Sequence, residues 1–326
     1  MKNQCASINS SSLQVFGVAQ LGTGLKEVSV VLSAYSRDRS DQVLDCIKSL
    51  RAQSLLPKEI ILVLDPDQGL VDFYKSRLPD YVKVVVSEGF GLSKARNAGV
   101  KKAEGEVIAF IDDDAVAEKD WLQNLVRNYD APCVVGVGGF VEPIWESNRP
   151  VWLPEELNWI VGCSYKGLPE HKANVRNPIG CNMSFRKSVF ERVGYFRSDI
   201  GRFGKKLLAG EEAELSTRIL EKIPNSKIVY DPSAVVHHRV DKNRVSLRYM
   251  WKRSFYEGLS KALITSPKWN SSTTLSTEDR YLKGLIKVAI PSRLKRIYKF
   301  ENMSQLVTLL FSLCAVFMGF SFARLR

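Results

Sequence analysis

Three consecutive aspartates, Asp112, Asp113 and Asp114, follow an apolar run at residues 107–111. The run is rich in β-branched residues and too short for a helix, so it predicts a buried central strand. The carboxyl ends of such strands face the ligand crevice in open α/β sheets. Adjacent carboxylates repel one another, which favours a bound divalent cation that can in turn hold a diphosphate. Alternation predicts Asp112 and Asp114 on one face and Asp113 on the other. The alternative is an acidic turn that caps the helix near Trp121.

The elements before these aspartates alternate between strands and helices. Apolar runs at residues 28–32, 59–64, 82–86 and 107–111 predict strands, and residues 41–53, 70–77 and 91–100 read as helices. The first strand continues into Ser33-Ala34-Tyr35-Ser36-Arg37, and the second ends on Asp65. Short connections between alternating elements predict an α/β fold with a doubly wound, mainly parallel sheet.

The chain becomes irregular after a helix at 120–129 and a strand at 133–137. Three tryptophans, Trp145, Trp152 and Trp159, are interspersed with prolines, which is typical of a long functional loop or an irregular half-domain. A strand before residue 187, helices at 187–193 and from 210, and strands at 227–230 and 235–239 follow. The glutamates Glu211, Glu212 and Glu214 lie in the first turn of the helix that begins near 210, where the helix dipole favours them.

The composition limits the classes of function. A net charge of +12 and a pI of about 9.4 indicate an anionic partner: nucleic acid, lipid headgroups or a phosphorylated substrate. The six cysteines are scattered without CxxC spacing, which predicts buried free thiols in a reducing compartment and neither a zinc site nor a disulfide framework. We expect residues 1–26 to be a flexible lead-in without a secretory signal.

The C-terminal part combines basic and apolar segments. Residues 241–265 predict a basic amphipathic helix, residues 266–304 a basic linker, and residues 305–323 a single transmembrane or membrane-inserted helix. Positive charge is denser before this helix than after it, so the positive-inside rule predicts a membrane-associated protein with its folded domain in the cytoplasm. The alternative is a hydrophobic C-terminal helix docked on the domain.

Taken in order, several of these features resemble the family 2 glycosyltransferases of GT-A fold, over roughly residues 28–265. The resemblance rests on Ser33-Ala34-Tyr35 after the first strand, Asp65, the segment Gly91-Leu92-Ser93-Lys94-Ala95-Arg96-Asn97, the aspartate triplet and Gly210-Glu211-Glu212. It implies a GT-A domain at 27–265, with a nucleotide-binding half at 27–140 and an acceptor half at 141–240. Within the family, the chain is similar to membrane-associated enzymes that extend dolichyl- or polyprenyl-phosphate-linked sugars, including glucuronosyltransferases that act on dolichyl phosphate glucose.

The resemblance also implies roles for individual residues. Asp65 matches the carboxylate that accepts the uracil N3–H, although an N-cap role is the alternative. Asp114 would ligate Mg²⁺ or Mn²⁺ directly, and Asp112 would contact the ribose or a metal-bound water. The nucleotide-sugar site would comprise Ala34, Tyr35, Arg37, Asp65, Lys94, Arg96, Asp112 and Asp113.

Glu212 matches the family's catalytic base, in a motif most often written Glu-Asp; here the second position is also glutamate, so Glu211 and Glu214 remain alternatives. His237 and His238 follow a strand where some relatives place a metal-ligating histidine. Neighbours in a strand face opposite ways, so at most one can be a ligand, and we favour His237. The alternative is a purely structural histidine.

The function that follows is an inverting, metal-dependent transfer of a hexose or hexuronic acid from a UDP-sugar to a lipid-linked acceptor at a membrane. A uronic acid donor would need a cation, for which Arg176, Arg186, Arg202 and Lys205 are unranked candidates. A glycosyltransferase of cell-surface polysaccharides is one alternative. A sugar nucleotidyltransferase is another, although the first strand lacks the glycine-rich loop that it needs. We expect no nucleic-acid partner, because the densest basic segments border the apolar tail.

Overall fold

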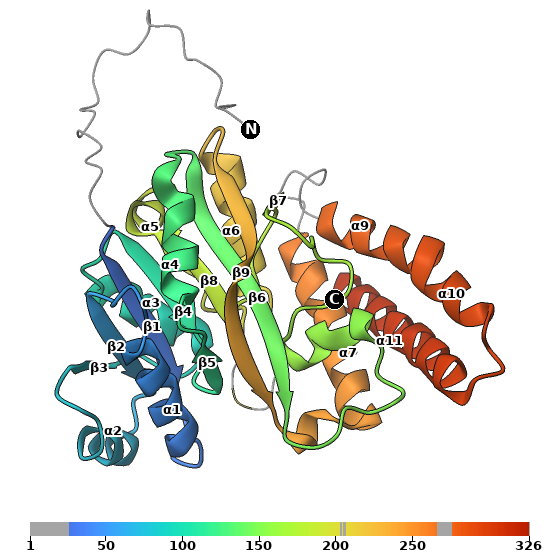
Figure 1. Cartoon of the computed structure of the whole chain (residues 1–326), viewed down its shortest axis with the longest axis horizontal. Coiled ribbons are helices and arrows are strands. Elements are labelled where there is room, and N and C mark those ends of the chain that lie inside the picture. The colour runs from blue at the N-terminus through green and yellow to red at the C-terminus, as the bar shows by residue number, and fades with distance from the viewer. Residues whose placement is uncertain (1–25, 203, 205–206, 266–275, 326) are drawn as a thin grey trace, which may run out of the picture.

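The computed structural model describes residues 26–202, 204, 207–265 and 276–325, and the predicted lead-in lies almost wholly outside them. Strands and helices alternate through the first half of the domain, as the sequence predicts (Figure 1). These elements are β1 (Val28–Ala34), α1 (Ser40–Arg51), β2 (Glu59–Leu64), α2 (Gln68–Lys75), β3 (Val82–Val86), α3 (Leu92–Lys102) and β4 (Val107–Ile111). Strand β1 pairs in parallel with β2 and β4, and β2 pairs in parallel with β3, so their carboxyl ends share one edge.

Strand alternation builds an apolar core on each face of this sheet. In β1, Val30 and Leu32 join the core that also contains residues of α1 and α2, whereas Val31 joins the core packed against α3 and α6. The side chains of β4 alternate in the same way: Ala109 joins the core on the first face of the sheet, and Phe110 joins the core on the second. Both faces are therefore buried, which explains why these strands are continuous hydrophobic runs in the sequence.

The second half extends the sheet with antiparallel strands. The further elements are β5 (Ala115–Ala117), α4 (Trp121–Val126), β6 (Val134–Trp145), β7 (Ala173–Val175), β8 (Asn182–Arg186), α5 (Lys187–Val193), α6 (Glu211–Lys222) and β9 (Lys227–Val240), with a 3₁₀ helix at Glu155–Val161. The strand order is β3-β2-β1-β4-β8-β6-β9-β5, and β7 pairs with β9. The sheet is thus mixed: β8 runs antiparallel to β4 and β6, while β9 runs parallel to β6.

The C-terminal part contains more helix than the sequence predicts. Helix α7 spans Leu247–Ile264, α9 spans Ser276–Gly284, a π-helical segment spans Leu285–Ala289, α10 spans Ile290–Leu294 and α11 spans Phe300–Arg324. The stretch predicted as a linker, 266–304, is therefore helical at residues 276–294 and 300–304, and residues 266–275 lie outside the described part. The physical reason is that Leu285 and Ala289 bury apolar surface against Met250 and Leu309, an amphipathic pattern that the many lysines and arginines of this stretch obscure.

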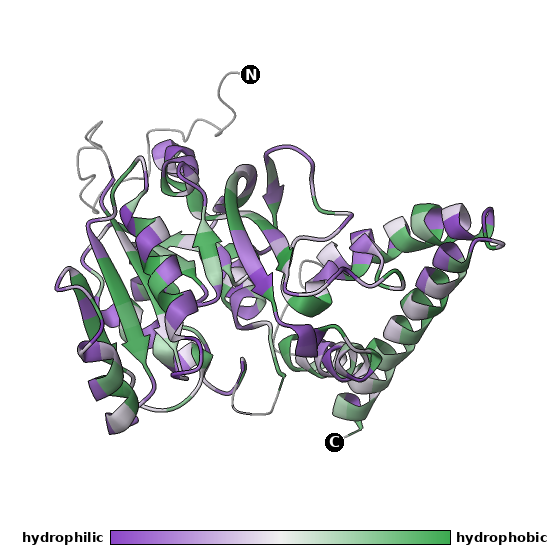
Figure 2. Cartoon of the chain, turned by 60° about the horizontal axis from the view of Figure 1, so that its bottom comes forward, coloured by the Kyte–Doolittle hydropathy of each residue, from purple (hydrophilic) through white to green (hydrophobic). Residues whose placement is uncertain are grey.

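Helix α11 packs closely along α7. A Cβ atom on Gly319 would lie 1.9 Å from the Phe255 carbonyl oxygen, and one on Gly258 would lie 1.9 Å from the Val316 carbonyl oxygen. Only glycine permits this approach of two backbones. The hydroxyls of Ser254 and Ser312 also share a hydrogen bond of 2.9 Å. The predicted alternative of a helix docked on the domain thus describes one side of α11, while Val307, Leu310 and Phe317 on this largely hydrophobic helix are exposed (Figure 2).

Candidate active site

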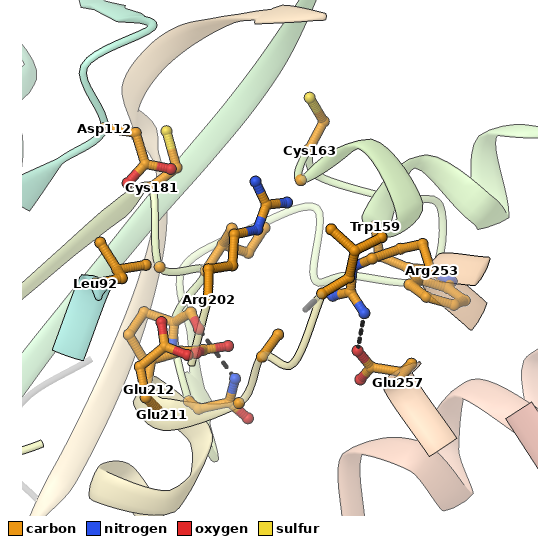
Figure 3. Close-up of a pocket in the computed structure, with 18 of the residues that line it drawn as sticks. Leu92, Asp112, Trp159, Cys163, Cys181, Arg202, Glu211, Glu212, Arg253 and Glu257 are labelled. Carbon is orange, nitrogen blue, oxygen red and sulfur yellow. Dashed lines mark hydrogen bonds and ion pairs between the residues drawn. The ribbon is translucent and has the colours of Figure 1, made fainter. Parts of the chain in front are cut away.

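A cleft of about 760 Å³ opens at the carboxyl ends of the parallel strands and reaches the C-terminal helices. Its lining includes Ala34 from β1, Asp65 after β2, the aspartate triplet after β4, and the start of α6. Trp159, Tyr249 and Val316 line the opposite side, so α7 and α11 both contribute to it. Figure 3 shows Asp112 and Cys181 on one side of this space and Trp159, Arg253 and Glu257 on the other.

The aspartates lie in a turn, because β4 ends at Ile111 and the next strand begins at Ala115. The predicted strand alternation therefore does not apply. Asp113 and Asp114 instead pair with the same arginine side chain: Arg39 Nη1 lies 3.1 Å from Asp113 Oδ1 and 3.1 Å from Asp114 Oδ2. Sequence reasoning missed Arg39, since nothing in its spacing marks it as a neighbour of residues more than seventy positions away.

Asp114 is the most heavily paired of the three carboxylates. His238 Nε2 lies 3.2 Å from its Oδ1, and Arg244 Nη2 lies 3.3 Å from its Oδ2. Burial works to raise the pKa of Asp114, but the charges of His238 and the two arginines outweigh it and hold the pKa below its usual range. Asp114 is therefore a carboxylate at neutral pH, as a metal ligand must be.

Asp113 behaves in the opposite way. Burial first, and the neighbouring Asp114 second, raise its pKa to about 7. Its Oδ2 atom is buried without a hydrogen-bond partner among the described residues. An unsatisfied buried oxygen beside a charged carboxylate is costly unless a positive group joins it, which is consistent with a cation-binding turn.

Strand register brings further candidate ligands to the turn. The pairing of Ile111 with Asn182 places Cys181 beside Asp112, and the pairing of Ala115 with His238 places the imidazole beside Asp114. One ligand atom each from Asp112, Cys181 and His238 lie within 4.8 Å of one another. Burial raises the pKa of the Cys181 thiol well above its usual value, so it stays neutral and is a poor ligand for a hard cation. The carboxylate oxygens and the imidazole fit Mg²⁺ or Mn²⁺.

The histidine prediction needs a correction. His237 points out of the cleft, where Nε2 lies 3.1 Å from Glu118 and Nδ1 lies 3.2 Å from Glu142. His238 is the buried member of the pair and contacts Asp114. The two do face opposite ways in β9, as alternation requires, but the sequence offered no signal for which face is buried. We therefore replace His237 by His238 as the candidate ligand.

This correction is testable with two single variants. His238→Ala should lower activity by about 10- to 100-fold, the usual cost of disturbing a group in or behind a metal site. His237→Ala should stay within about twofold of the wild type, because its carboxylate partners are exposed and such pairs contribute little. The initial rate as a function of Mn²⁺ concentration is the measurement. An equal loss in both variants would contradict the assignment.

The three glutamates of α6 have separate environments. Glu211 is buried and pairs with Arg96 at 2.6 Å, while Glu214 is buried and pairs with Arg218 at 2.7 Å. Glu212 lines the cleft, and no cation of the described residues lies within ion-pair distance of it. Burial first, and Glu211 second, raise the pKa of Glu212 to about 7. Glu214 is thereby removed from the candidates for a base, and Glu212 has the properties that a base needs.

The turn before α6 fixes this arrangement. Gly210 has a φ of +97°, a left-handed conformation that glycine adopts without strain. A Cβ there would also lie 2.7 Å from Ile264 Cδ1 at the end of α7. The turn is thus held between the sheet and α7, and it directs Glu212 into the cleft between them.

The predicted nucleotide-sugar residues divide into two groups. Ala34, Tyr35, Asp65, Arg96, Asp112 and Asp113 line the cleft. Burial raises the pKa of Asp65, and a hydrogen bond from the Gly91 amide partly offsets this. Arg96 is engaged by Glu211, Asp112 and the Gly180 carbonyl oxygen, so it organises carboxylates. Lys94 and Arg37 are exposed residues outside the lining, and Arg37 lies against Phe73 of α2. The structure does not bring these two to the site.

The side of the cleft formed by α7 and α9 carries a chain of buried and half-buried charges that sequence reasoning missed. It runs from Arg253 to Glu257, from Glu257 to Lys261, and from Lys261 through Glu278 to Arg176. Opposite charges four residues apart in α7 are a usable signal for the first two of these pairs. Of the three tryptophans, Trp159 lines the cleft, whereas Trp145 and Trp152 pack against the apolar cluster around Leu157 without lining it.

The architecture is that of a glycosyltransferase of GT-A fold: a first half of parallel strands, an acidic turn at its edge and a mixed-stranded second half across the cleft. The chain belongs to the glycosyl transferase family 2, whose family model matches residues 29–194. It is 34% identical to the glucosyl-dolichyl phosphate glucuronosyltransferase of Haloferax volcanii over 288 residues, 87% of this chain and 91% of the relative.

Two solved structures share the fold. The mannosyltransferase PcManGT from Pyrobaculum calidifontis, in complex with GDP-Man and Mn²⁺, is 16% identical with a TM-score of 0.58, over 90% of this chain and 86% of that one. GalNAc-T7 with UDP, GalNAc and Mn²⁺ is 16% identical with a TM-score of 0.52, over 82% of this chain and 57% of that one. Both of these structural neighbours thus bind Mn²⁺ together with a nucleotide or nucleotide sugar.

Proposed function

We propose that this glycosyltransferase moves a sugar from a UDP-sugar to a hydroxyl of a lipid-linked acceptor, with inversion at the anomeric carbon and with Mg²⁺ or Mn²⁺. The observation that carries the proposal is the shared cleft of the aspartate turn and Glu212. One end of the cleft has the carboxylates to hold a cation and a diphosphate, and the other has a carboxylate whose pKa of about 7 suits proton transfer at neutral pH.

The residues act in the following way. Asp65 accepts a hydrogen bond from the uracil N3–H. Asp112, Asp114 and His238 would hold the cation, which when bound would supply positive charge to offset that of the departing diphosphate. Glu212 takes the proton of the acceptor hydroxyl while that oxygen forms a bond to C1. The C1–O bond to UDP breaks on the opposite face, so a single displacement inverts the anomeric centre.

The experiment is a donor screen with membranes that contain the full chain. We expect transfer from a UDP-sugar to a polyprenyl-phosphate-linked acceptor, its loss on chelation with EDTA, and its return with Mn²⁺ or Mg²⁺. GDP-sugars are the comparison donors and should be poorer, because the larger purine places its N1–H and N2–H donors differently from the uracil N3–H that Asp65 accepts. Undiminished transfer in EDTA would overturn the metal assignment, and the absence of turnover with every UDP-sugar would overturn the function.

The lipid-linked acceptor is supported by the position of α11. This helix is long and apolar enough to cross a membrane, with a mean hydropathy of 2.2 in its most apolar window, and only 33% of that window is buried. Its buried side also borders the active site, since Ser312, Leu313 and Val316 line the cleft. An acceptor whose reacting end sits at a bilayer surface would reach Glu212 along this wall, with its hydrocarbon tail toward the exposed face of α11.

The outer face of α11 gives a prediction about membrane binding. Val307, Leu310 and Phe317 are 61%, 49% and 71% exposed. Replacing all three by serine should weaken vesicle binding by at least about a hundredfold, because each loses roughly 1.5 kcal/mol of transfer free energy. The cleft-lining face is untouched, so UDP affinity should be unchanged. Vesicle flotation and UDP titration are the measurements.

A matched control for this variant replaces exposed apolar residues near β2 and the edge strand β3, far from α11 in the sequence. Leu56, Tyr81 and Val86 are 53%, 46% and 45% exposed, so their replacement by serine removes a comparable apolar surface. This control should bind vesicles as the wild type does. Equal loss in both triple variants, or full binding by the α11 variant, would contradict membrane association through this helix.

A further inference from the structure

Arg202 differs from the other half-buried and buried cations of the cleft in having no acidic partner. The paired cations are Arg39 with Asp113 and Asp114, Arg96 with Glu211 and Asp112, Arg176 with Glu278, Arg244 with Asp114, Arg253 with Glu257, and Lys261 with Glu257 and Glu278. Within the described residues, no carboxylate lies within ion-pair distance of the Arg202 guanidinium. All aspartates and glutamates of the chain fall inside the described ranges, so this comparison covers every acidic side chain.

The surroundings of Arg202 make its unpaired positive charge energetically unfavourable. Burial, and then the charges of Arg244 and Arg253, lower the pKa of Arg202 from its ordinary value. A guanidinium nevertheless stays protonated in proteins, so its charge persists in a partly desolvated cleft beside other cations. The Tyr249 hydroxyl, also in the lining, is buried without a hydrogen-bond partner among the described residues. Two polar groups on this side of the cleft are therefore available to a ligand.

The position of Arg202 points to the transferred sugar. The Arg202 carbonyl oxygen accepts a hydrogen bond from the Leu92 amide at the start of α3, which anchors the loop beside the nucleotide-binding half. Figure 3 shows its side chain between the Asp112–Cys181 side and the Trp159–Arg253 side, with the guanidinium directed away from Glu211 and Glu212. The sugar carbon under attack must lie between the diphosphate at the aspartate turn and the base Glu212. The guanidinium thus stands where substituents of the donor sugar lie.

The other cations suggested for a uronic acid carboxylate are less suitable. Arg176 already binds both carboxylate oxygens of Glu278. Arg186 lies outside the cleft and donates to the backbone carbonyl oxygens of Val134 and Tyr129. Lys205 lies outside the described residues. Arg202 is the described candidate that lines the cleft without an acidic partner.

We propose that Arg202 binds the carboxylate of a hexuronic acid in the donor and so makes this enzyme selective for a UDP-uronate over the neutral UDP-hexose. The proposal rests on the proposed function, since it names the donor class of the same site. A planar guanidinium pairs with a carboxylate through two parallel N–H···O bonds, a geometry that the primary hydroxyl of a neutral hexose cannot offer.

The test compares two donors that differ only at C6. Wild type, Arg202→Lys and Arg202→Gln are assayed with UDP-glucuronate and with UDP-glucose under saturating Mn²⁺. Arg202→Gln should lose about a hundredfold or more in kcat/KM for UDP-glucuronate, mainly through KM, since a charged hydrogen-bonded pair is lost. Its kcat/KM for UDP-glucose should not fall. Arg202→Lys should keep about a tenth or more of the wild-type kcat/KM for UDP-glucuronate, because lysine restores the charge without the bidentate geometry.

Arg280→Gln is the matched control, because Arg280 is an exposed cation of the same lining and should leave both donors unaffected. A parallel loss for both donors would assign Arg202 to the diphosphate and overturn the proposal. A wild type that prefers UDP-glucose would also overturn it while leaving the proposed function intact. Failure of every UDP-sugar would instead refute the proposed function itself. Binding of UDP alone, measured for each variant, shows that the cleft is folded.

Discussion

Replacing Asp114 by asparagine should reduce sugar transfer by about a thousandfold or more, because several kcal/mol of electrostatic stabilisation at the leaving diphosphate would be lost. The amide keeps the shape of the side chain but removes the charge that balances Arg39 and Arg244. It also binds a hard cation more weakly than a carboxylate does. The Mn²⁺ dependence of UDP affinity should disappear together with activity, as titration calorimetry with and without Mn²⁺ would show.

Asp114 is buried, so its loss also has a structural cost that must be separated from the catalytic one. Breaking a buried ion pair on one side typically costs about 3–5 kcal/mol of folding free energy. Asp231 provides the control: it is likewise buried, pairs with Arg127 at 3.1 Å and lies outside the cleft lining. Asp231→Asn should lower the melting temperature without lowering kcat. A folded Asp114→Asn protein with normal turnover would contradict the assignment of Asp114 to the site.

The sequence was most informative where the physics is local. Strands buried on both faces, such as β2 and β4, are continuous apolar runs, and their order along the chain predicts a doubly wound half with carboxylates at one edge. Strand β9 is continuous over the two predicted strands at 227–230 and 235–239, but the interruption that Asp231 and Pro232 indicate is present as an irregularity in its pairing: Gly139 pairs with Asp231, and the next residue, Phe140, pairs with Val235. Asp231 accepts hydrogen bonds from Arg127, Asn128 and Ser233, which lets a polar residue stay within the strand.

The site was less predictable because its contacts join distant parts of the chain. Glu212 could be recognised from a short motif, whereas its isolation from cations depends on Arg96 pairing with Glu211. The choice of His238 over His237 depends on which face of β9 is covered by the domain. Periodicity gives the alternation of two side chains but not the identity of the buried one.

Glu212→Gln should lower kcat by about 10²- to 10⁴-fold, the usual contribution of a general base, while leaving the affinity for UDP unchanged. Glutamine keeps the size and the hydrogen-bonding oxygen of the side chain but cannot accept a proton. Glu214→Gln is the control for a buried glutamate of the same helix: it breaks the pair with Arg218 and should reduce stability more than catalysis. Turnover by Glu212→Gln at the wild-type rate would refute its role.

The pH profile distinguishes Glu212 from Glu211. A base must be deprotonated, and the raised pKa of Glu212, about 7, predicts that kcat falls about tenfold per pH unit below that value and levels off above it. Glu211→Gln removes the neighbouring negative charge that raises the pKa of Glu212 and keeps the positive charge of Arg96 that lowers it, so the pKa of Glu212 falls. The acidic limb of the profile should therefore move to lower pH in Glu211→Gln while activity persists. If Glu211 were the base, this variant would be inactive at every pH, so one titration decides between the two residues.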